Sequence, residues 1–274
     1  MIFVHDKGRM CNNILQYGHL YAWGREHGRQ TMSMRFAYKY DYFYICHTRH
    51  HNFLTYLFAK YAAKCRLLPV ATFDVDTPSH LAQQEQVMLR HQHIVAQGWY
   101  AHWYDLFLKY KNEIISLFQF DERVRKTPDL LLNRSPKSKC DLRIGIHIRR
   151  GDYRKWNNGR YFYSDQQYID VIRKFLILHK EQTVQLFVCG NDPDLDEVAF
   201  QEAFSEVSIC FPKGNPGEDL YLLSQCDRLI GAPSTFTLVA SMYRDVPLYW
   251  IEDPNRAFTD ADFGHFDQLF QQIR

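Results

Sequence analysis

The second half of the chain alternates strand-like and helix-like segments in a way that few folds allow. Short apolar runs suited to buried strands are separated by longer segments in which apolar residues recur at helical spacing. Strands that alternate with helices form βαβ units and a parallel sheet, so this half predicts a doubly wound lobe of the nucleotide-binding type. The predicted strands are 142–148, 184–189, 207–211, 228–231 and 248–251, and the predicted helices are 164–178, 193–204, 219–225 and 235–242.

The first half opens on a similar strand, loop and helix unit. A strand at 2–4 is followed by a loop at 5–13 and by a helical pattern that begins at Ile14 and that Gly28 can cap. The elements expected after it are a helix at 52–63, a strand at 66–73, a helix at 103–118 and, in the stretch 126–141 with its prolines, serines and lysines, a linker between lobes.

Length and composition support two lobes of an ordinary soluble enzyme. A chain of 274 residues exceeds the usual size of a single core. We expect an N-terminal, acceptor-side lobe at 1–137 and a C-terminal, donor-binding lobe at 138–274, with the last helix able to pack back on the first lobe. The formal charge of +2 excludes the broad basic surface that wraps nucleic acid, so any anion site must be local.

The cysteine pattern and the opening of the sequence predict a cytoplasmic protein. Seven cysteines are scattered singly, without the paired spacing of a disulfide framework, and we interpret them as reduced thiols. The opening MIFVHDKGRMC has neither the basic start nor the apolar middle of a signal peptide, and we find no transmembrane segment. Peripheral contact with a membrane stays open.

A histidine, two arginines and an aspartate follow one another in the stretch LRIGIHIRRGDY. Side chains alternate along a strand, so His147 and Arg149 share one face while Arg150 leaves the strand end. A guanidinium offers a planar fork that fits phosphate oxygens and stays charged at working pH. These residues favour a phosphate ligand. The alternative is a fold-stabilising ion pair of an arginine with Asp152 or Asp141.

Two further segments place polar side chains where a parallel sheet binds its ligands. Ser234 and Thr235 lie between a strand and a helix, where hydroxyls and unpaired backbone amides meet an anion. Asp219 opens the preceding predicted helix. Capping of the helices is the alternative for these residues. Because ligands bind beyond the carboxyl ends of parallel strands, the segments together favour a nucleotide site.

Several stretches resemble the fucosyltransferases. GIHIRRGDY looks like the first motif shared by the α-1,2-, α-1,6- and protein O-fucosyltransferases, LFVCGNDPD is similar to the second, and DLYLLSQCDRLIGAPSTFTLVASMY to the third. GRMCNNILQYGHLYA resembles the GGLGNQMFQYA opening of the α-1,2 branch, and GWYAHWYDLFLKYKNEI its GYFQSEKYF segment. Cys11 stands where that branch has glycine, Asn13 where it has glutamine, and the QSEK core is absent. The closest resemblance is to bacterial α-1,2-fucosyltransferases of glycosyltransferase family 11.

The resemblance implies an α/β protein of the GT-B class, with two Rossmann-like lobes facing across a cleft. It implies inverting, metal-independent transfer of L-fucose from GDP-fucose to a hydroxyl of a glycan acceptor, with no cofactor besides the donor substrate. Arg149 and helix-end amides would stabilise the leaving GDP where other transferases use a metal. Carried over residue by residue, His147 and Arg149 hold the diphosphate, Asp219 the guanine, Ser234, Thr235 and Phe236 the phosphate and nucleoside, and Asn12 and Asn13 lie near the sugar.

The acceptor and the general base are less defined. We expect transfer α-1,2 to galactose in the synthesis of a bacterial surface polysaccharide. The alternatives are another linkage, or a non-catalytic module that binds a sugar nucleotide or glycan. Asp152 is the candidate base, although it can instead orient one of the arginines.

Three other signals compete with this hypothesis. Asp74 and Asp76 in TFDVDTP mimic the DxD metal motif of other transferases, but Thr77 and Pro78 suggest a turn. The stretch CHTRHH has zinc-ligand residue types without the paired spacing of a structural site, and we interpret it as a polar loop at the acceptor cleft. Four aromatic residues can stack on an acceptor sugar or form a half-buried helical face: Trp99, Tyr100, Trp103 and Tyr104.

Overall fold

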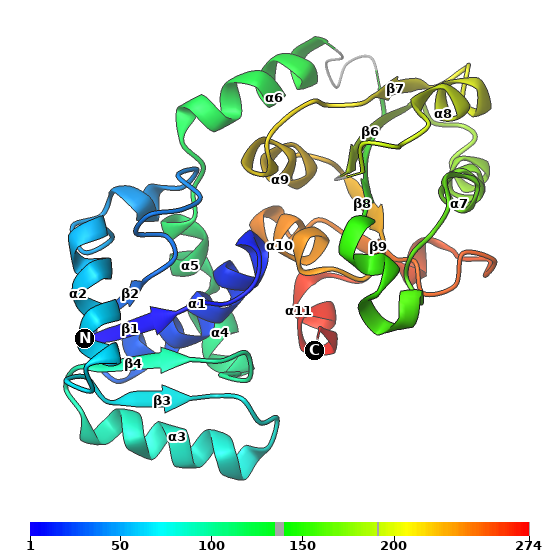
Figure 1. Cartoon of the computed structure of the whole chain (residues 1–274). Coiled ribbons are helices and arrows are strands. Elements are labelled where there is room, and N and C mark those ends of the chain that lie inside the picture. The colour runs from blue at the N-terminus through cyan, green and yellow to red at the C-terminus, as the bar shows by residue number, and fades with distance from the viewer. Residues whose placement is uncertain (135–139, 191, 274) are drawn as a thin grey trace. The chain divides into compact units, whose positions relative to one another are not determined.

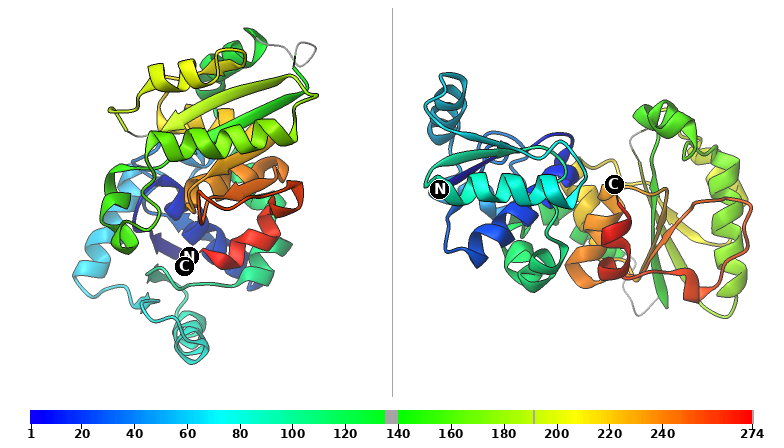
Figure 2. Two further views of the ribbon diagram at one scale, coloured as in Figure 1. Left: turned by 90° about the vertical axis from the view of Figure 1, so that its right-hand side faces the viewer. Right: turned by 90° about the horizontal axis from the view of Figure 1, so that it is seen from below.

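The computed structural model describes residues 1–134, 140–190 and 192–273, which form two compact units, Met1–Asp121 and Glu122–Arg274. The division lies earlier in the chain than the boundary expected at 137/138, and the role assigned to each lobe stays a prediction. Each unit has a parallel sheet with helices packed on it, so the α/β class with two Rossmann-like lobes is confirmed (Figures 1 and 2). No helix in the described ranges is long and apolar enough to cross a membrane.

The first unit is built on a four-stranded sheet in the order β2-β1-β4-β3. Its strands are β1 (Ile2–His5), β2 (Thr31–Ser33), β3 (Val70–Thr72) and β4 (Ile94–Gln97). Phe3 and Val95 on one face of the sheet pack with Ala59 and Ala62 of α2, which gives that face an apolar core. The helices are α1 (Met10–Glu26), α2 (Phe53–Lys64), α3 (Pro78–Arg90), α4 (Tyr104–Lys109) and α5 (Lys111–Leu117), with a short 3₁₀ turn η1 at Tyr44–His47.

Several sequence expectations for this unit were wrong in their bounds. Helix α1 begins at Met10, four residues before the expected start, because Met10, Cys11 and Asn13 are buried and extend its packed face. The expected helix at 103–118 is two helices that meet at Tyr110. Thr77 and Pro78 do not form a plain turn: Thr77 is the N-cap of α3 and Pro78 its first residue, a common way to start a helix.

The second unit has a five-stranded parallel sheet in the order β7-β6-β5-β8-β9. Ile144, Ile146 and Ile148 of the central strand face α7 and α8, while the other face carries α9 and α10 (Figure 1). Gly145 is required on the second face, because a Cβ there would lie 2.6 Å from the Leu223 side chain. The strands are β5 (Leu142–Ile148), β6 (Val184–Gly190), β7 (Ser208–Cys210), β8 (Arg228–Gly231) and β9 (Leu248–Trp250); the helices are α6 (Glu122–Arg134), α7 (Asp165–Leu178), α8 (Glu197–Ala203), α9 (Pro216–Ser224), α10 (Thr235–Arg244) and α11 (Phe266–Leu269).

The expected linker at 126–141 is wrong over its first part, which belongs to helix α6. Val124, Pro128 and Leu132 recur at a spacing of four, and their buried face packs on α9 within the second unit. Residues 135–139 lie outside the described residues. At the other end of the unit, α11 packs on α10, and its packing on the first lobe stays a prediction.

Helix α9 begins before Asp219, which corrects the prediction that Asp219 opens it. Asn215 caps the helix by accepting hydrogen bonds from the amides of Gly217 and Glu218, and the Glu218 side chain accepts one from the Asn215 amide. Asn215 and Pro216, with glutamate two positions after the proline, are a capping signal that the sequence analysis missed. Asp219 is therefore not needed as a cap.

Candidate active site

The polar residues of the second unit meet where its strand order reverses. The chain runs from β5 outward to β7 and then returns to β8 on the other side of β5, which makes the β5/β8 edge a topological switch point. His147 and Gly231 are register partners there, and a Cβ on Gly231 would lie 2.9 Å from the His147 carbonyl oxygen. Arg149 follows β5 directly, and Ser234 lies three residues after β8, so both expected phosphate segments are at this edge.

Arg149 is held in place beside the end of β5. Its Nη2 lies 2.7 Å and 2.9 Å from the two carboxylate oxygens of Asp152, and its guanidinium lies 5.1 Å from the ring centre of Tyr153. Its backbone amide donates a hydrogen bond of 3.3 Å to the hydroxyl of Tyr168. The ion pair with Asp152, which the sequence analysis gave as the alternative, is thus present. It orients the Arg149 side chain, and its partner Asp152 is half exposed.

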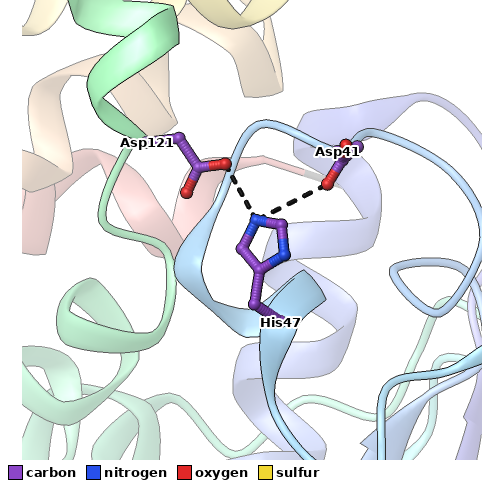
Figure 3. A group of neighbouring side chains, drawn as sticks. All are labelled: Asp41, His47 and Asp121. Carbon is purple, nitrogen blue, oxygen red and sulfur yellow. Dashed lines mark hydrogen bonds and ion pairs between the residues drawn. The ribbon is translucent and has the colours of Figure 1, made fainter.

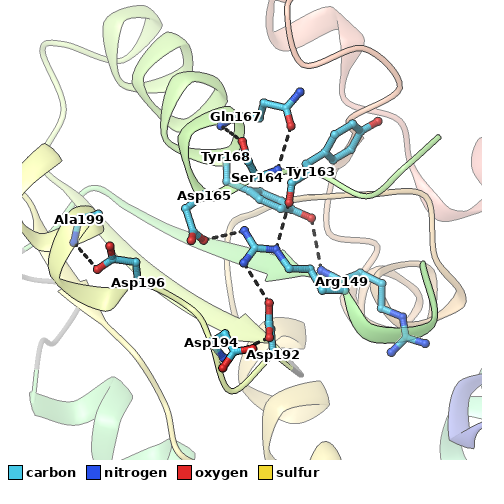
Figure 4. A network of polar contacts seen from close by, with 11 residues as sticks. Arg149, Tyr163, Ser164, Asp165, Gln167, Tyr168, Asp192, Asp194, Asp196 and Ala199 are labelled. Atoms are coloured by element: carbon cyan, nitrogen blue, oxygen red, sulfur yellow. Dashed lines mark hydrogen bonds and ion pairs between the residues drawn. The ribbon is translucent and has the colours of Figure 1, made fainter. Parts of the chain in front are cut away.

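Arg150 has a different environment and a structural role. Its Nη1 and Nη2 pair with Asp192 at 3.0 Å and Asp165 at 2.6 Å, and its Nε donates to the Tyr163 carbonyl oxygen. The side chain is 6% exposed. In Figure 4, Asp165 and Asp192 point toward this cluster while the Arg149 side chain points away from it. Sequence reasoning missed both acidic partners, which belong to α7 and to the segment after β6.

His147 is a buried, neutral imidazole. Its ring stacks on Phe236 with the ring centres 4.6 Å apart, and its Nδ1 is buried with no hydrogen-bond partner among the described residues. Burial, and then the charge of Arg149, lower the pKa of His147 to about 3. Any contact of His147 with a phosphate oxygen therefore depends on an N–H donor and not on a positive charge.

Ser234 is the N-cap of α10, so the capping alternative is observed. Its hydroxyl accepts a hydrogen bond of 3.3 Å from the amide of Thr237, whose own hydroxyl accepts one from Trp250 Nε1. A cap of this kind satisfies only one of the amides at a helix start. The amides of Thr235 and Phe236 belong to the same first turn, where the helix dipole favours an anion.

Asp219 presents a carboxylate oxygen without a partner. It lies in the first turns of α9, where its Oδ1 is buried and makes no hydrogen bond within the described residues. Burial, and then the charge of Glu218, raise the pKa of Asp219 to about 7. A buried acceptor without a donor is costly, so the geometry suits a ligand that supplies N–H groups.

Asn12 and Asn13 lie in the first turn of α1, not in the expected loop. Asn13 is fully buried, and neither atom of its side-chain amide has a hydrogen-bond partner in the part of the chain that the structure describes. Gly8 makes the turn before the helix, with φ of +91° and no room for a Cβ, which would lie 2.7 Å from Asn12 Nδ2. The buried side-chain amide of Asn13 is thus able to hydrogen-bond a ligand.

The first unit also contains a buried carboxylate that the sequence analysis missed. Asp6 follows β1 and is 1% exposed; its Oδ2 accepts a hydrogen bond from the Ser33 hydroxyl, while Oδ1 is buried without a partner among the residues described. Burial raises the pKa of Asp6 to about 7, against the opposing hydrogen bonds from Ser33 and Arg35. The position of Asp6 directly after a buried strand was the sequence feature that could have indicated it.

The two metal alternatives from the sequence are not assembled as such. Asp74 pairs with His80 Nε2 at 3.3 Å. In CHTRHH, His51 accepts a hydrogen bond from the Ser33 amide, and His47 lies between Asp121 at 2.9 Å and Asp41 at 3.6 Å (Figure 3). This histidine with two carboxylates has a metal-ligand composition, and its Nε2 already contacts both carboxylates directly.

A family comparison connects these features. The family model described as "Glycosyl transferase family 11" matches residues 81–245, more than half of the chain. The chain belongs to glycosyl transferase family 11. It is therefore an enzyme, a glycosyltransferase, and the resemblance to the fucosyltransferase superfamily seen in the sequence is confirmed. The alternative of a non-catalytic module is set aside. No curated protein matches the sequence.

Solved structures support the fold of this family 11 member. A mutant of FUT1 from Arabidopsis thaliana in complex with GDP matches with a TM-score of 0.65 at 16% identity, covering 96% of this chain and 73% of that one. POFUT1 in complex with GDP matches with a TM-score of 0.58 at 10% identity, covering 89% of this chain and 94% of that one. NodZ alpha-1,6-fucosyltransferase soaked with GDP-fucose matches with a TM-score of 0.55 at 15% identity, covering 96% of this chain and 97% of that one. The predicted GT-B fold class is confirmed.

Proposed function

We propose that this glycosyltransferase transfers L-fucose from GDP-fucose to a hydroxyl of a glycan, α-1,2 to galactose, with inversion and without a metal ion. The observation that carries the proposal is the switch point of the second unit, where an oriented arginine and the start of α10 lie at adjacent strand ends. Solved proteins of similar fold bind GDP and GDP-fucose, which agrees with this choice of donor.

The proposed chemistry follows from the charge that develops on the leaving group. As the fucosyl bond to GDP breaks, negative charge grows on the β-phosphate. Arg149 and the first amides of α10 stabilise this charge, because they are oriented before the reaction and need not reorganise. His147 adds a neutral N–H donor, and Thr235 and Phe236 contact the phosphate and nucleoside. Asn12 and Asn13 hold the sugar.

The base for the acceptor hydroxyl is proposed to be Asp152. Both of its oxygens contact Arg149, while half of its side chain is exposed, so a hydroxyl can reach it. In this arrangement one carboxylate orients the arginine and accepts the proton of the incoming hydroxyl. The direct test is incubation of the protein with GDP-fucose and galactose- or glucosamine-terminated glycans, with the linkage and anomeric configuration read from the product by NMR. Retention at the anomeric carbon, or transfer only from another sugar nucleotide, contradicts the proposal.

We expect fucosyl transfer to survive chelation. The positive charge at the proposed donor site is supplied by Arg149 and helix-end amides, so excess EDTA changes the turnover by less than about twofold. Turnover of GDP-fucose is measured before and after EDTA, with Mn²⁺ added back. A loss that Mn²⁺ restores moves the donor site to Asp74 and Asp76.

Asp219→Ala is expected to weaken GDP binding about ten- to a hundredfold and to leave the weak binding of ADP and UDP nearly unchanged. Guanine presents N1–H and the N2 amino group side by side, two donors that one carboxylate accepts together, whereas adenine and uracil offer no such pair. Hydrogen bonds to a charged group contribute about 1.5–3 kcal/mol, which sets the size of the loss. Calorimetric titration of the three nucleotides on both proteins measures it.

The raised pKa of Asp219 adds a pH signature to this prediction. An ionised carboxylate is needed to accept both guanine donors, and with a pKa of about 7 it is mostly protonated at pH 6 and mostly ionised at pH 8. GDP affinity therefore rises by up to about tenfold over this range in the wild type, beyond the change in the Asp219→Asn control. Because Asn215 caps α9, Asp219→Ala keeps the melting temperature. A variant that still prefers GDP by the original margin places the guanine contact elsewhere.

A further inference from the structure

Residues 98–104, here called the aromatic loop, follow β4 in the first unit. Apart from Gly98 and Ala101 the loop consists of aromatic or histidine side chains, and all of these are partly exposed. The loop is irregular as far as Trp103, and only Tyr104 belongs to α4. The alternative of a half-buried helical face is therefore wrong for most of it. Partly exposed rings at the carboxyl end of a parallel strand stand where such sheets bind ligands.

The aromatic loop is anchored at both ends. Gly98 has φ of +110°, and a Cβ there would lie 2.2 Å from the carbonyl oxygen of Phe73, the residue after β3. That same oxygen accepts a hydrogen bond of 3.0 Å from the Tyr100 amide. At the other end, the Trp103 amide donates to His19 Nδ1 on α1 at 3.1 Å. The backbone of the loop is therefore fixed at both ends within the first unit.

Trp103 and His19 form the packed side of this arrangement. The Trp103 ring contacts Phe73 and Trp23, at centroid distances of 5.6 Å and 6.0 Å, and both of these rings are fully buried. His19 is 2% exposed, and burial, followed by the charge of His102, lowers its pKa well below the ordinary value. These two side chains attach the loop to α1 and to the segment after β3.

His102 is the polar centre of the loop. Its Nδ1 lies 3.2 Å from the Tyr104 hydroxyl, and its ring is surrounded by Trp99 at 5.7 Å, Tyr100 at 6.0 Å and His19 at 5.1 Å. Burial lowers its pKa, although the charge of Asp76 and the Trp99 backbone act in the opposite direction. The lowered pKa favours the neutral imidazole, whose ring has one N–H donor and one acceptor nitrogen for hydroxyl groups.

This combination of groups fits a sugar ring. Aromatic faces bury the apolar C–H face of a pyranose, while a few fixed polar groups, here an imidazole and a phenol, select its hydroxyls. The charge of Asp76 acts on the pKa of His102, and Asp76 comes from the segment after β3, the parallel neighbour of β4.

We propose that the aromatic loop is the subsite for the terminal sugar of the acceptor glycan, with Trp99 and Tyr100 as the stacking surface and His102 as the hydrogen-bond acceptor for a sugar hydroxyl. The inference rests on the proposed function, because it assigns the acceptor of that reaction to the first unit. It adds which residues determine the acceptor and leaves the donor site as described.

The test uses the full chain and three defined probes: lactose, N-acetyllactosamine and chitobiose. Binding is measured by saturation-transfer NMR, and KM and kcat are measured for whichever probe is fucosylated. Trp99→Ala and His102→Ala are expected to raise the acceptor KM about tenfold or to abolish the NMR signal. Trp99→Phe and His102→Gln keep a ring and an acceptor oxygen and recover part of the binding. Tyr61→Ala, at a side chain 54% exposed on α2, is the control and keeps the wild-type values.

Donor measurements separate this proposal from the proposed function. GDP binding and the hydrolysis of GDP-fucose without acceptor stay within about twofold of wild type in all of these variants. If the wild type does not use GDP-fucose, the proposed function fails, whereas sugar binding by the loop is still decided by NMR. Equal acceptor binding in wild type and variants overturns the inference, and so does a wild type that binds none of the probes. A parallel loss of melting temperature, donor binding and acceptor binding also overturns it, since the loop is then only structural.

Discussion

Arg149→Lys is expected to lower the rate of fucosyl transfer by about 10²–10³-fold, roughly 2.7–4 kcal/mol of transition-state stabilisation, although the positive charge is kept. Asp152 orients the guanidinium through Nη2 at the carboxyl end of β5, and a planar guanidinium contacts phosphate oxygens through two nitrogens together. A lysine ammonium is a single point that cannot make both sets of contacts with one geometry. The measurement is kcat/KM for GDP-fucose at saturating acceptor.

The stability of the same variant is the control. Asp152 is half exposed, and an ion pair with such a partner contributes at most about 1 kcal/mol to the free energy of unfolding. Arg149→Lys and Arg149→Ala therefore melt close to the wild type while they lose activity. If Arg149→Lys transfers fucose within about twofold of the wild-type rate, the arginine is structural and the assignment of the donor site fails.

The second unit was predictable because most of its strands are buried runs that alternate regularly with helices, and two of them, β5 and β6, have seven residues each. Strands 142–148 and 228–231 have the predicted bounds, since each is a buried run ended by polar or glycine residues. In the first unit, β2 and β3 have only three residues each, too short for a periodic pattern to define. Helix α3 was missed for another reason: its N-terminal Thr-Pro signal also fits a turn.

The candidate site could be predicted as a location but not as a set of contacts. Strand alternation placed His147 and Arg149 on one face, and the stacking of His147 on Phe236 of α10 is consistent with that placement. Whether Asp219 caps a helix depended on where the helix starts, which Asn215 decides. Asp6 was missed because a lone aspartate after a short strand is an ordinary sequence feature until its burial is known.

Arg149 and Arg150 show most clearly what the sequence alone does not predict. Sequence places Arg149 and Arg150 side by side with the same chemistry, and strand alternation separates their faces without showing that Arg150 is a structural arginine. Their roles are separated by Asp165 and Asp192, partners that lie far along the chain and that pair with Arg150 in the folded unit. Long-range pairing of this kind leaves no periodic signal.

Arg150→Met is expected to lower the free energy of unfolding of the second unit by about 3–5 kcal/mol, because it leaves two carboxylates without their buried partner. Burial works to raise the pKa of Asp192, but the hydrogen bonds from Arg150 and from the Asp194 amide bring that pKa below its ordinary value. A carboxyl group with a lowered pKa stabilises the fold at neutral pH, and this contribution is lost as the pH falls through the folded-state value. The loss in the variant is therefore measured by urea unfolding at pH 7, where the contribution is complete.

A compensated variant decides whether the cause is the unpaired charge. Adding Asp165→Asn and Asp192→Asn to Arg150→Met removes the stranded carboxylates, and since replacing a whole buried ion-pair group by neutral residues is often close to neutral, most of the lost stability returns. Arg149→Met, which removes the ion pair with the half-exposed Asp152, changes the free energy of unfolding by less than about 1 kcal/mol. A loss below about 1 kcal/mol in Arg150→Met, or no recovery in the triple variant, contradicts the structural role. Arg150 then becomes the candidate for the phosphate contact, and Arg149 becomes the candidate structural arginine.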